Sequence, residues 1–318
     1  MDIEQLTQIA TEVIAPVIVM VAVGYLIGRL RVVEPEPIAA VYMTVFTPAL
    51  AFMGWLNANL SGDMLARVFL FSALAAAVMH ALSYGVSRAM GHDRGMRGAF
   101  INANIMYNSA NYGLPVQAMA FKGLGEVVQP LVLMIQSLIA FTVGSFNAAS
   151  NSPSLRATLK QVLQMPVIWA TILGGIVHST GYTGTMLKRD LPMVWAPLNY
   201  FQMALVPVAL LSLGVQLSRV RIHGKALNIA VACFLRLVTG PLIGLGIGYL
   251  LLGLRGEMLA ILVVSVSFPT AVFSSVVATS FKNHEDFAAA QVFISTVISI
   301  VTVTLVIYLS KVYLVPTV

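Results

Sequence analysis

Charge is the property that this sequence has least of. Only 9% of its 318 residues are Asp, Glu, Lys or Arg, whereas 58% are hydrophobic and the mean hydropathy is +0.89. A soluble globular domain carries about 25% charged residues, so the chain must expose an apolar surface to lipid. Its apolar runs are about 20 residues long, which suits membrane-spanning helices and not the strands of about 10 residues found in barrels. The composition therefore predicts an all-α polytopic membrane protein.

Cysteine is almost absent, and this excludes two kinds of site. The single cysteine, Cys233, can form neither an intramolecular disulfide nor a multi-cysteine metal site. We expect no cofactor and no metal. The net charge of +6 could suggest a nucleic-acid partner, but the basic residues are spread singly over loops, as in a membrane protein with positive cytoplasmic loops. The predicted environment is the lipid bilayer, with no nucleic acid.

Enzyme motifs are also missing. The sequence contains no His-Glu-x-x-His, no Gly-x-Ser-x-Gly and no Walker loop. His80 is the one acid or base expected deep in a span; it is a candidate proton relay, although an interhelical hydrogen bond explains it more simply. We therefore expect a protein that is not an enzyme, with an intramembrane enzyme as the weakest alternative.

Ten apolar segments are present, and they fall into two sets of five. We expect spans at about residues 9–30, 37–56, 64–86, 98–121, 127–148, 162–180, 193–217, 225–252, 257–281 and 286–310. A first repeat would occupy residues 1–150, a cytoplasmic linker 151–161, and a second repeat 162–318. Because five is odd, the second repeat must enter the membrane upside down. Placing both termini outside leaves eleven of the 18 Lys and Arg in the cytoplasm and six outside, so we expect extracytoplasmic termini in a cytoplasmic (inner) membrane.

The fourth span contains an unusual polar interruption. Residues 108–115 read Asn-Ser-Ala-Asn-Tyr-Gly-Leu-Pro, and Gly113 and Pro115 predict a break in the helix. The asparagines, serine and tyrosine beside it are costly in hydrocarbon, so they should face a polar cavity. Pro269 follows Pro115 by 154 residues, within Ser265-Val-Ser-Phe-Pro-Thr270 of the ninth span. Two interrupted helices in matching halves indicate a transporter's binding site.

The two breaks predict a site for an anion. A broken helix exposes N–H groups with about half a positive charge where its second part begins, here expected near residues 116–117 and 270–271. If the breaks cross, two positive ends converge on one cavity, and Asn108, Asn111, Ser267 and Thr270 would orient a carboxylate. Arg236, about ten residues into the eighth span, lacks an equally deep carboxylate. It would bind an anionic substrate or backbone carbonyls, or extend to the interface.

These residues resemble the auxin efflux carrier family. Residues 108–115 are similar to its N-x-G-N-x-G-x-P signature, with Ala110 in place of the first glycine. Residues 48–50 and 207–217 resemble its second and seventh helices, residues 268–271 its second crossover, and Arg236-Leu-x-x-Gly-Pro241 its eighth helix. The resemblance covers the whole chain, and the short polar stretch between the halves is typical of prokaryotic members.

The resemblance implies a PIN-like, bile-acid-symporter-like fold of ten helices in two inverted five-helix repeats, with broken, crossing helices 4 and 9. It implies a scaffold of helices 1, 2, 6 and 7, a homodimer through those helices, and an elevator-type movement of the rest. The expected substrate is a small organic anion, auxin-like or malonate- or malate-like. An anion-binding receptor or regulatory subunit without transport is the alternative. The predicted substrate-binding residues are Asn108, Asn111, Tyr112, Gly113, Pro115, Ser267, Pro269, Thr270 and Arg236.

Overall fold

The computed structural model describes residues 7, 11, 15–57, 62–148, 163–164, 166–219 and 226–315. Throughout these ranges the regular structure is helical, and the one extended pairing is an isolated antiparallel bridge between Tyr107 and Thr270. The prediction of an all-α membrane protein is confirmed at this level. The predicted linker, residues 151–161, and the first residues of the first and sixth predicted spans lie outside the described residues.

Between residues 15 and 148 the described part of the chain forms five helical stretches, several of them composite. They are α2 (Ala15–Arg29); α3 (Pro35–Val41), the π-helical η2 (Tyr42–Phe46) and α4 (Thr47–Asn57); α5 (Gly62–Ala89); α6 (Arg94–Ile105), the π-helical η3 (Ser109–Gly113) and α7 (Leu114–Ala120); and α8 (Leu124–Ile139), η4 (Ala140–Gly144) and α9 (Ser145–Ala148). Each stretch coincides with one of the apolar segments expected from the sequence.

The second half follows a similar plan with one added short helix. Its elements are α11 (Pro166–Ser179); α12 (Gly184–Asp190); α13 (Pro192–Ser218); α14 (Ala226–Phe234), η5 (Leu235–Thr239), α15 (Gly240–Leu245) and η6 (Gly246–Leu251); α16 (Gly256–Ser265) and α17 (Val272–Ser280); and α18 (Glu285–Tyr313). The helix α12 was not expected, because its seven residues include Lys188, Arg189 and Asp190 and read as a polar loop.

Five of the described helices are long and apolar enough to cross a bilayer. They are Gly62–Ala89, Leu124–Ala148, Pro192–Ser218, Ala226–Leu251 and Glu285–Tyr313. Three shorter apolar helices, Ala15–Arg29, Pro166–Ser179 and Gly256–Ser265, accompany them. The fourth and ninth predicted spans do not form continuous helices because each is interrupted near its middle. The protein is a multi-pass membrane protein.

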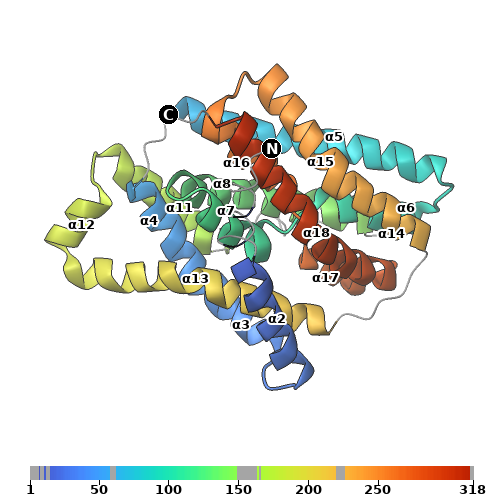
Figure 1. Ribbon diagram of the computed structural model, residues 1–318, viewed down its shortest axis with the longest axis horizontal. Helices are drawn as coiled ribbons and strands as arrows, with labels where there is room; N and C mark the ends of the chain where they lie inside the picture. The colour runs from blue at the N-terminus through green and yellow to red at the C-terminus, as the bar shows by residue number, and fades with distance from the viewer. Residues whose placement is uncertain are drawn as a thin grey trace.

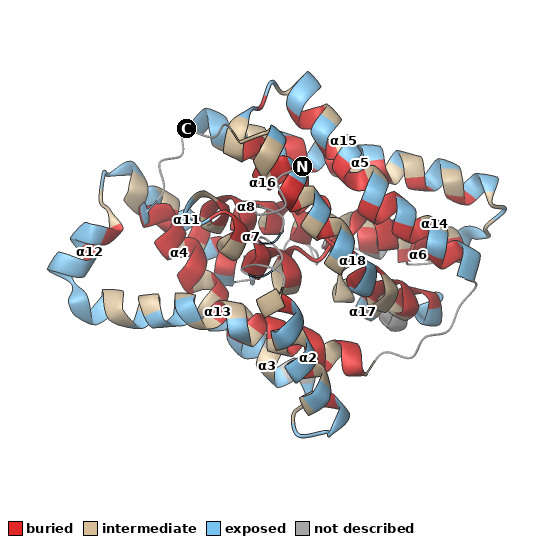
Figure 2. Ribbon diagram, in the orientation of Figure 1, coloured by how far each residue is buried: buried red, intermediate tan, exposed pale blue. Residues whose placement is uncertain are grey.

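The helices form two groups that meet near the centre of the molecule (Figure 1). We call α2, α3–α4 and α11–α13 the scaffold group, and α5–α9 with α14–α18 the core group. In the scaffold group, α2 packs along α13 and α11 packs along α4. In the core group, α7, α8 and α16 lie at the centre and are largely buried (Figure 2). The interrupted helices are thus enclosed by the rest of the chain.

Glycines bring α2 and α13 into backbone contact. A Cβ added to Gly24 would lie 2.1 Å from the carbonyl oxygen of Leu211, and one added to Gly214 would lie 2.0 Å from that of Val21. Small residues at such crossings let membrane helices approach closely and gain van der Waals packing. The scaffold group is therefore held together by a contact that no larger side chain allows.

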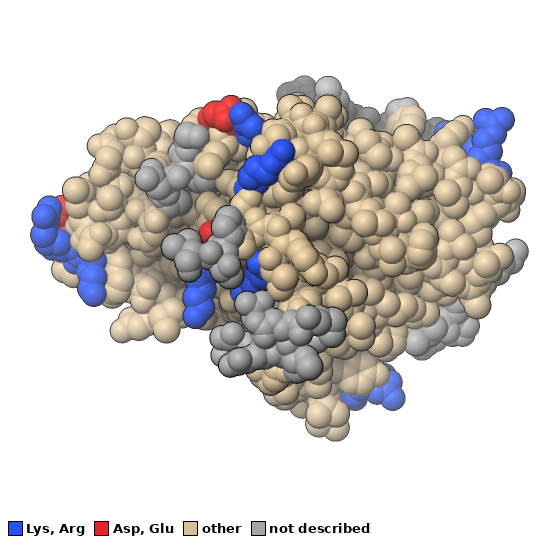
Figure 3. Space-filling view, turned by 45° about the horizontal axis from the view of Figure 1, so that its top comes forward, with Lys and Arg blue, Asp and Glu red and all other residues tan. Residues whose placement is uncertain are grey.

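The outer surface carries the apolar side chains expected of a lipid-facing protein. Val19, Leu26, Leu250 and Val301 are each at least 60% exposed, and they come from both groups. Charged side chains are sparse on the face shown in Figure 3, with wide uncharged areas between them. This distribution matches the shortage of charge in the sequence.

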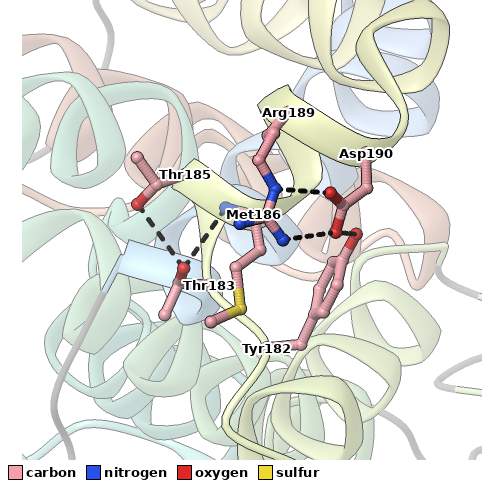
Figure 4. Close-up of polar contacts among 6 residues, drawn as sticks. All are labelled: Tyr182, Thr183, Thr185, Met186, Arg189 and Asp190. Carbon is pink, nitrogen blue, oxygen red and sulfur yellow. Dashed lines mark hydrogen bonds and ion pairs between the residues drawn. The ribbon is translucent and has the colours of Figure 1, made fainter.

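A compact polar corner joins α11 to α13 through α12 (Figure 4). The Thr183 hydroxyl accepts a hydrogen bond from the Met186 N–H at 3.3 Å and so caps α12. Arg189 donates to both carboxylate oxygens of Asp190, at 2.6 and 3.2 Å, and this contact lowers the pKa of Asp190. Exposed charges gather at the end of the α11–α13 hairpin, where the chain meets water.

Substituting Gly214 should separate the two scaffold helices. The Cβ of Gly214→Ala would collide with backbone of α2, and overpacking of this kind costs about 1–3 kcal/mol. Gly246→Ala is the matched control, because its Cβ would meet nothing within 4 Å. Thermal unfolding in detergent can be followed with a maleimide dye that becomes fluorescent on reacting with Cys233, the single thiol, which is buried. We expect a lower melting temperature for Gly214→Ala only; equal melting curves would contradict the contact.

Candidate functional site: two interrupted helices in contact

The first interruption lies between α6 and η3. Helix α6 begins after Asp93, whose carboxylate accepts a hydrogen bond from the Met96 N–H at 2.8 Å; this bond, with the nearby His284, lowers the pKa of Asp93. The helix ends at Ile105, and Met106 is already extended. The Asn108 side chain then starts η3 by accepting from the Asn111 N–H at 3.1 Å. The polar motif at residues 108–115 therefore supplies the cap that restarts the helix.

The break occurs earlier than the sequence predicted. Gly113 and Pro115 were expected to interrupt the helix, but helical structure resumes at Ser109 and both residues are helical. Pro115 lies in the first turn of α7, where a missing N–H and a fixed φ are tolerated. Consequently residues 116–117 do not present the first N–H groups of the restarted helix, and that part of the prediction was wrong.

The second interruption lies between α16 and α17. Helix α16 ends at Ser265, and residues 266–271 are not helical before α17 begins at Val272. Pro269 is within this interval, as expected. Ser267 donates to the carbonyl of Val264 at 2.7 Å and so closes the end of α16. Thr270 is fully buried and donates through its hydroxyl to the Ala103 carbonyl of α6 at 2.8 Å.

The two interruptions pair with each other. The Asn108 N–H donates to the Pro269 carbonyl and the Ala271 N–H donates to the Met106 carbonyl, each at 2.8 Å. These bonds form the antiparallel bridge between Tyr107 and Thr270. The Thr270 N–H is used as well, because it donates to the Ser295 hydroxyl of α18 at 3.1 Å. Thus the N–H groups of residues 270–271, predicted to face an anion, bind protein acceptors instead.

Arg236 lies between the two broken helices. It belongs to the π-helical η5, is 2% exposed, and donates to the carbonyls of Asn104 in α6 and of Val266 after α16. Its guanidinium carbon also lies 4.9 Å from the centroid of the Tyr107 ring. Of the readings that the sequence left open, the structure shows binding to backbone carbonyls. These carbonyls come from the C-terminal ends of α6 and α16, where partial negative charge gathers.

Gly240 makes room for this arginine. A Cβ at Gly240 would lie 2.8 Å from both the Arg236 Nη2 atom and the Val266 carbonyl oxygen. The Arg-Leu-x-x-Gly-Pro sequence therefore supplies both the guanidinium of Arg236 and, at Gly240, the space in which it contacts the Val266 carbonyl.

A buried chain of amides and hydroxyls joins the first interruption to α16. Gln129 of α8 donates to the Ser109 carbonyl at 3.1 Å and accepts from the Ser265 hydroxyl at 2.7 Å. Gln117 of α7 donates to the same hydroxyl at 3.0 Å and to the Ile261 carbonyl at 2.8 Å. Gln117, Gln129 and Ser265 are fully buried. The two glutamines were not among the predicted site residues, although each is a polar residue within an apolar run.

Most of the predicted site residues are enclosed. Tyr112 packs on Phe268 with ring centroids 5.6 Å apart, and a Cβ on Gly113 would meet Gln129 at 2.6 Å and Phe268 at 2.8 Å. The other buried members are Asn108, Pro115, Ser267, Pro269 and Thr270. Some buried polar side-chain atoms around the crossing have no hydrogen-bond partner among the described residues, including Asn104 Oδ1, Asn108 Nδ2, Ser109 Oγ, Gln117 Oε1 and Arg236 Nε.

Asn111 differs because it is partly exposed and faces the scaffold group. Within residues 101–117, only Ala110 and Asn111 are not buried. The Asn111 Oδ1 atom accepts from the Tyr42 hydroxyl of η2, and its Nδ2 donates to Gln216 Oε1 of α13 at 3.0 Å. Tyr42 and Gln216 were not predicted as site residues, because nothing in the sequence relates positions so far from Asn111 to this contact.

His80 is not part of this arrangement. It lies on α5 at intermediate exposure and hydrogen-bonds to none of the described residues. No group of three or more His, Cys, Asp and Glu among the described residues could hold a metal ion. The chemistry that the crossing offers is hydrogen bonding by neutral amides and hydroxyls beside one buried cation.

Replacing Arg236 tests its role as a partner of backbone carbonyls. In Arg236→Met the carbonyls of Asn104 and Val266 lose their cationic partner. We therefore expect the free energy of unfolding to fall by about 3 kcal/mol or more, even when no anion is present. Arg236→Lys should lose less, because one ammonium retains the charge but not the fork. Arg88→Met, at an exposed arginine, is the control. Tryptophan fluorescence during heating is the measurement, and unchanged stability of Arg236→Met would refute the role.

Two comparisons with known proteins agree with this architecture. A family profile described as "Membrane transport protein" matches residues 149–307, half of the chain. An uncharacterized transporter of Methanothermobacter thermautotrophicus is 27% identical over 305 residues, covering 93% of this chain and 97% of that protein. With the motif at residues 108–115 and the paired interruptions, these matches show that the chain belongs to the membrane transport protein family, the family of the auxin efflux carriers.

Proposed function

We propose that this transporter is a secondary or facilitative carrier of a small organic anion in the cytoplasmic membrane. One observation carries the proposal: two interrupted helices pair at the centre of the core group, with Arg236 bound to the carbonyl ends of both. Interrupted helices in matching halves are where secondary transporters bind substrates.

The position of Arg236 favours an anion. The C-terminal ends of α6 and α16 would otherwise repel negative charge, and the arginine compensates them. No acidic side chain lies in the first turn of η3 or α17, so no carboxylate neutralises the N-terminal end of either. Two buried donors, Asn108 Nδ2 and Arg236 Nε, also lack partners among the described residues. A carboxylate is the matching ligand.

The full architecture that we propose is ten spans in two inverted repeats. It is supported by packing: α2 against α13 joins the first and seventh segments, and α11 against α4 joins the sixth and second, as an inverted pair requires. In this arrangement residues 1–150 and 162–318 are the repeats, and both termini are extracytoplasmic. The scaffold group forms a homodimer, and the core group moves against it in an elevator-type cycle.

Asn111 is the residue through which the core group would bind the anion. Its side chain is partly exposed, whereas the other predicted site residues at the crossing are buried. Tyr112, Gly113, Pro115, Ser267, Pro269 and Thr270 then act by shaping and holding the crossing, and Asn108 by capping the helix that presents Asn111.

Flux measurements in proteoliposomes test the proposal. Radiolabelled malonate, malate and indole-3-acetate should be screened for saturable flux, with the direction, pH and sodium varied to define coupling. Binding without flux would favour a receptor, and chemical alteration of the label would favour an enzyme.

Asn111→Ala should lower saturable flux at least about tenfold, because a hydrogen bond to a charged group is worth about 1.5–3 kcal/mol. Asn199→Ala is the matched control. It removes an exposed amide of α13 that contacts Met203 and not the crossing, so it should leave flux unchanged. Equal flux in wild type and Asn111→Ala would remove Asn111 from the site.

A further inference from the structure

Asn111 is bound at both ends of its amide by the scaffold group. Its Oδ1 atom accepts from the Tyr42 hydroxyl, and its Nδ2 atom donates to Gln216 Oε1 at 3.0 Å. Tyr42 belongs to η2 and Gln216 to α13, whereas Asn111 belongs to η3 of the core group. These hydrogen bonds therefore span the boundary along which the two groups would move.

We propose that Tyr42 and Gln216 are positioning residues that, with Asn111, form a polar clasp between the two groups. The clasp sets the orientation of the Asn111 amide and holds the core group in its present position. This inference rests on the proposed function, because it assumes that the core group moves and that Asn111 meets the anion.

Both scaffold partners are held in place by their surroundings. Tyr42 is 1% exposed and packs in an apolar cluster with Leu50, Leu114, Leu133, Leu205 and Ala209. The Gln216 Nε2 atom donates to the Ser212 hydroxyl at 3.2 Å, one turn earlier on α13. Gln216 also lies two residues from Gly214, where α13 contacts the backbone of α2. The clasp thus joins two well-packed surfaces and not two mobile side chains.

The backbone at the clasp has the wide turn of a π-helix on both sides. Tyr42 begins η2 and Asn111 is the middle residue of η3. Single π-helical turns are uncommon and are frequent at functional sites, because the extra residue moves a side chain out of the regular helical register. Here that change in register brings side chains from the two groups within hydrogen-bonding distance.

An anion at Asn111 would compete with the clasp. The Tyr42 hydroxyl and the Asn111 amide are donors that now satisfy neutral oxygen acceptors. A carboxylate is a stronger acceptor than an amide oxygen, so both donors would turn to it. Binding would then release Asn111 from Gln216 and free the core group to move.

Distance measurements between the groups test the clasp without any substrate. Cys233→Ser removes the single thiol, and Met193→Cys and Lys122→Cys then carry spin labels on exposed positions of the scaffold and core groups. Double electron–electron resonance in lipid nanodiscs gives the populations of each distance. A hydrogen bond contributes about fivefold to an equilibrium constant.

We expect Tyr42→Phe and Gln216→Leu each to raise the ratio of a second distance population to the first by about fivefold. Gln216→Glu keeps an oxygen acceptor for Asn111, and because a carboxylate accepts more strongly than an amide, its ratio should be no higher than that of the wild type. Tyr200→Phe removes an exposed hydroxyl from α13 and is the matched control. Variants are compared after size-exclusion chromatography confirms a folded, monodisperse protein.

Unchanged distance populations in both Tyr42→Phe and Gln216→Leu would overturn the clasp, as would an equal change in Gln216→Glu. The flux of malonate, malate and indole-3-acetate is measured separately. A population shift without flux of any probe would leave the clasp standing and reject the proposed anion transport. Flux of a probe together with unchanged distance populations would support anion transport and reject the clasp.

Discussion

The fold depends on how two interrupted helices satisfy their backbone groups away from water. A helix that stops inside a low-dielectric region leaves N–H and C=O groups without partners, and each such group is expensive to bury. Here residues 106–108 and 266–271 bind each other through two 2.8 Å backbone hydrogen bonds, so each break supplies what the other lacks. Either interruption alone would leave these backbone groups without their present partners. The paired interruptions lie in the core group, where α7, α8 and α16 are largely buried.

Backbone pairing leaves a problem of charge, and Arg236 resolves it. The carbonyl ends of α6 and α16 both point into the crossing, where like partial charges would repel each other. A planar guanidinium can bind two carbonyls at once, which one ammonium does less well. Its position in a π-helical segment, and the absence of a side chain at Gly240, allow it to lie between them. The missing acidic partner, which made this arginine conspicuous in the sequence, is thereby explained by backbone acceptors.

The sequence predicted the arrangement of this site better than its details. Prolines in matching halves indicated two interruptions that meet, because proline position and repeat spacing are properties of the linear chain. The location of the first break was wrong because Asn108 caps η3 and makes Pro115 an ordinary first-turn proline. Two other features could not be predicted: Tyr42 and Gln216 lie 69 and 105 positions from Asn111, and their contact arises only from the packing of separate helices. The α-helical segments followed from hydrophobicity alone, whereas hydrogen-bond partners across them did not.

In the proposed carrier, substrate recognition and movement of the core group would be linked through the exposed part of the crossing. Its backbone groups pair across the two interruptions, and of the polar side chains within residues 101–117 only that of Asn111 is partly exposed. That side chain lies at the boundary between the scaffold and core groups, so a ligand that binds it changes the contacts between them. A rigid interior is necessary for this effect, because a ligand can bias two arrangements only if it contacts them differently. Had the exposed amide faced the inside of the core group, binding would have altered no contact with the scaffold. In the proposed cycle, the enclosed crossing would hold Asn111 at the boundary where its hydrogen bonds influence the position of the whole core group.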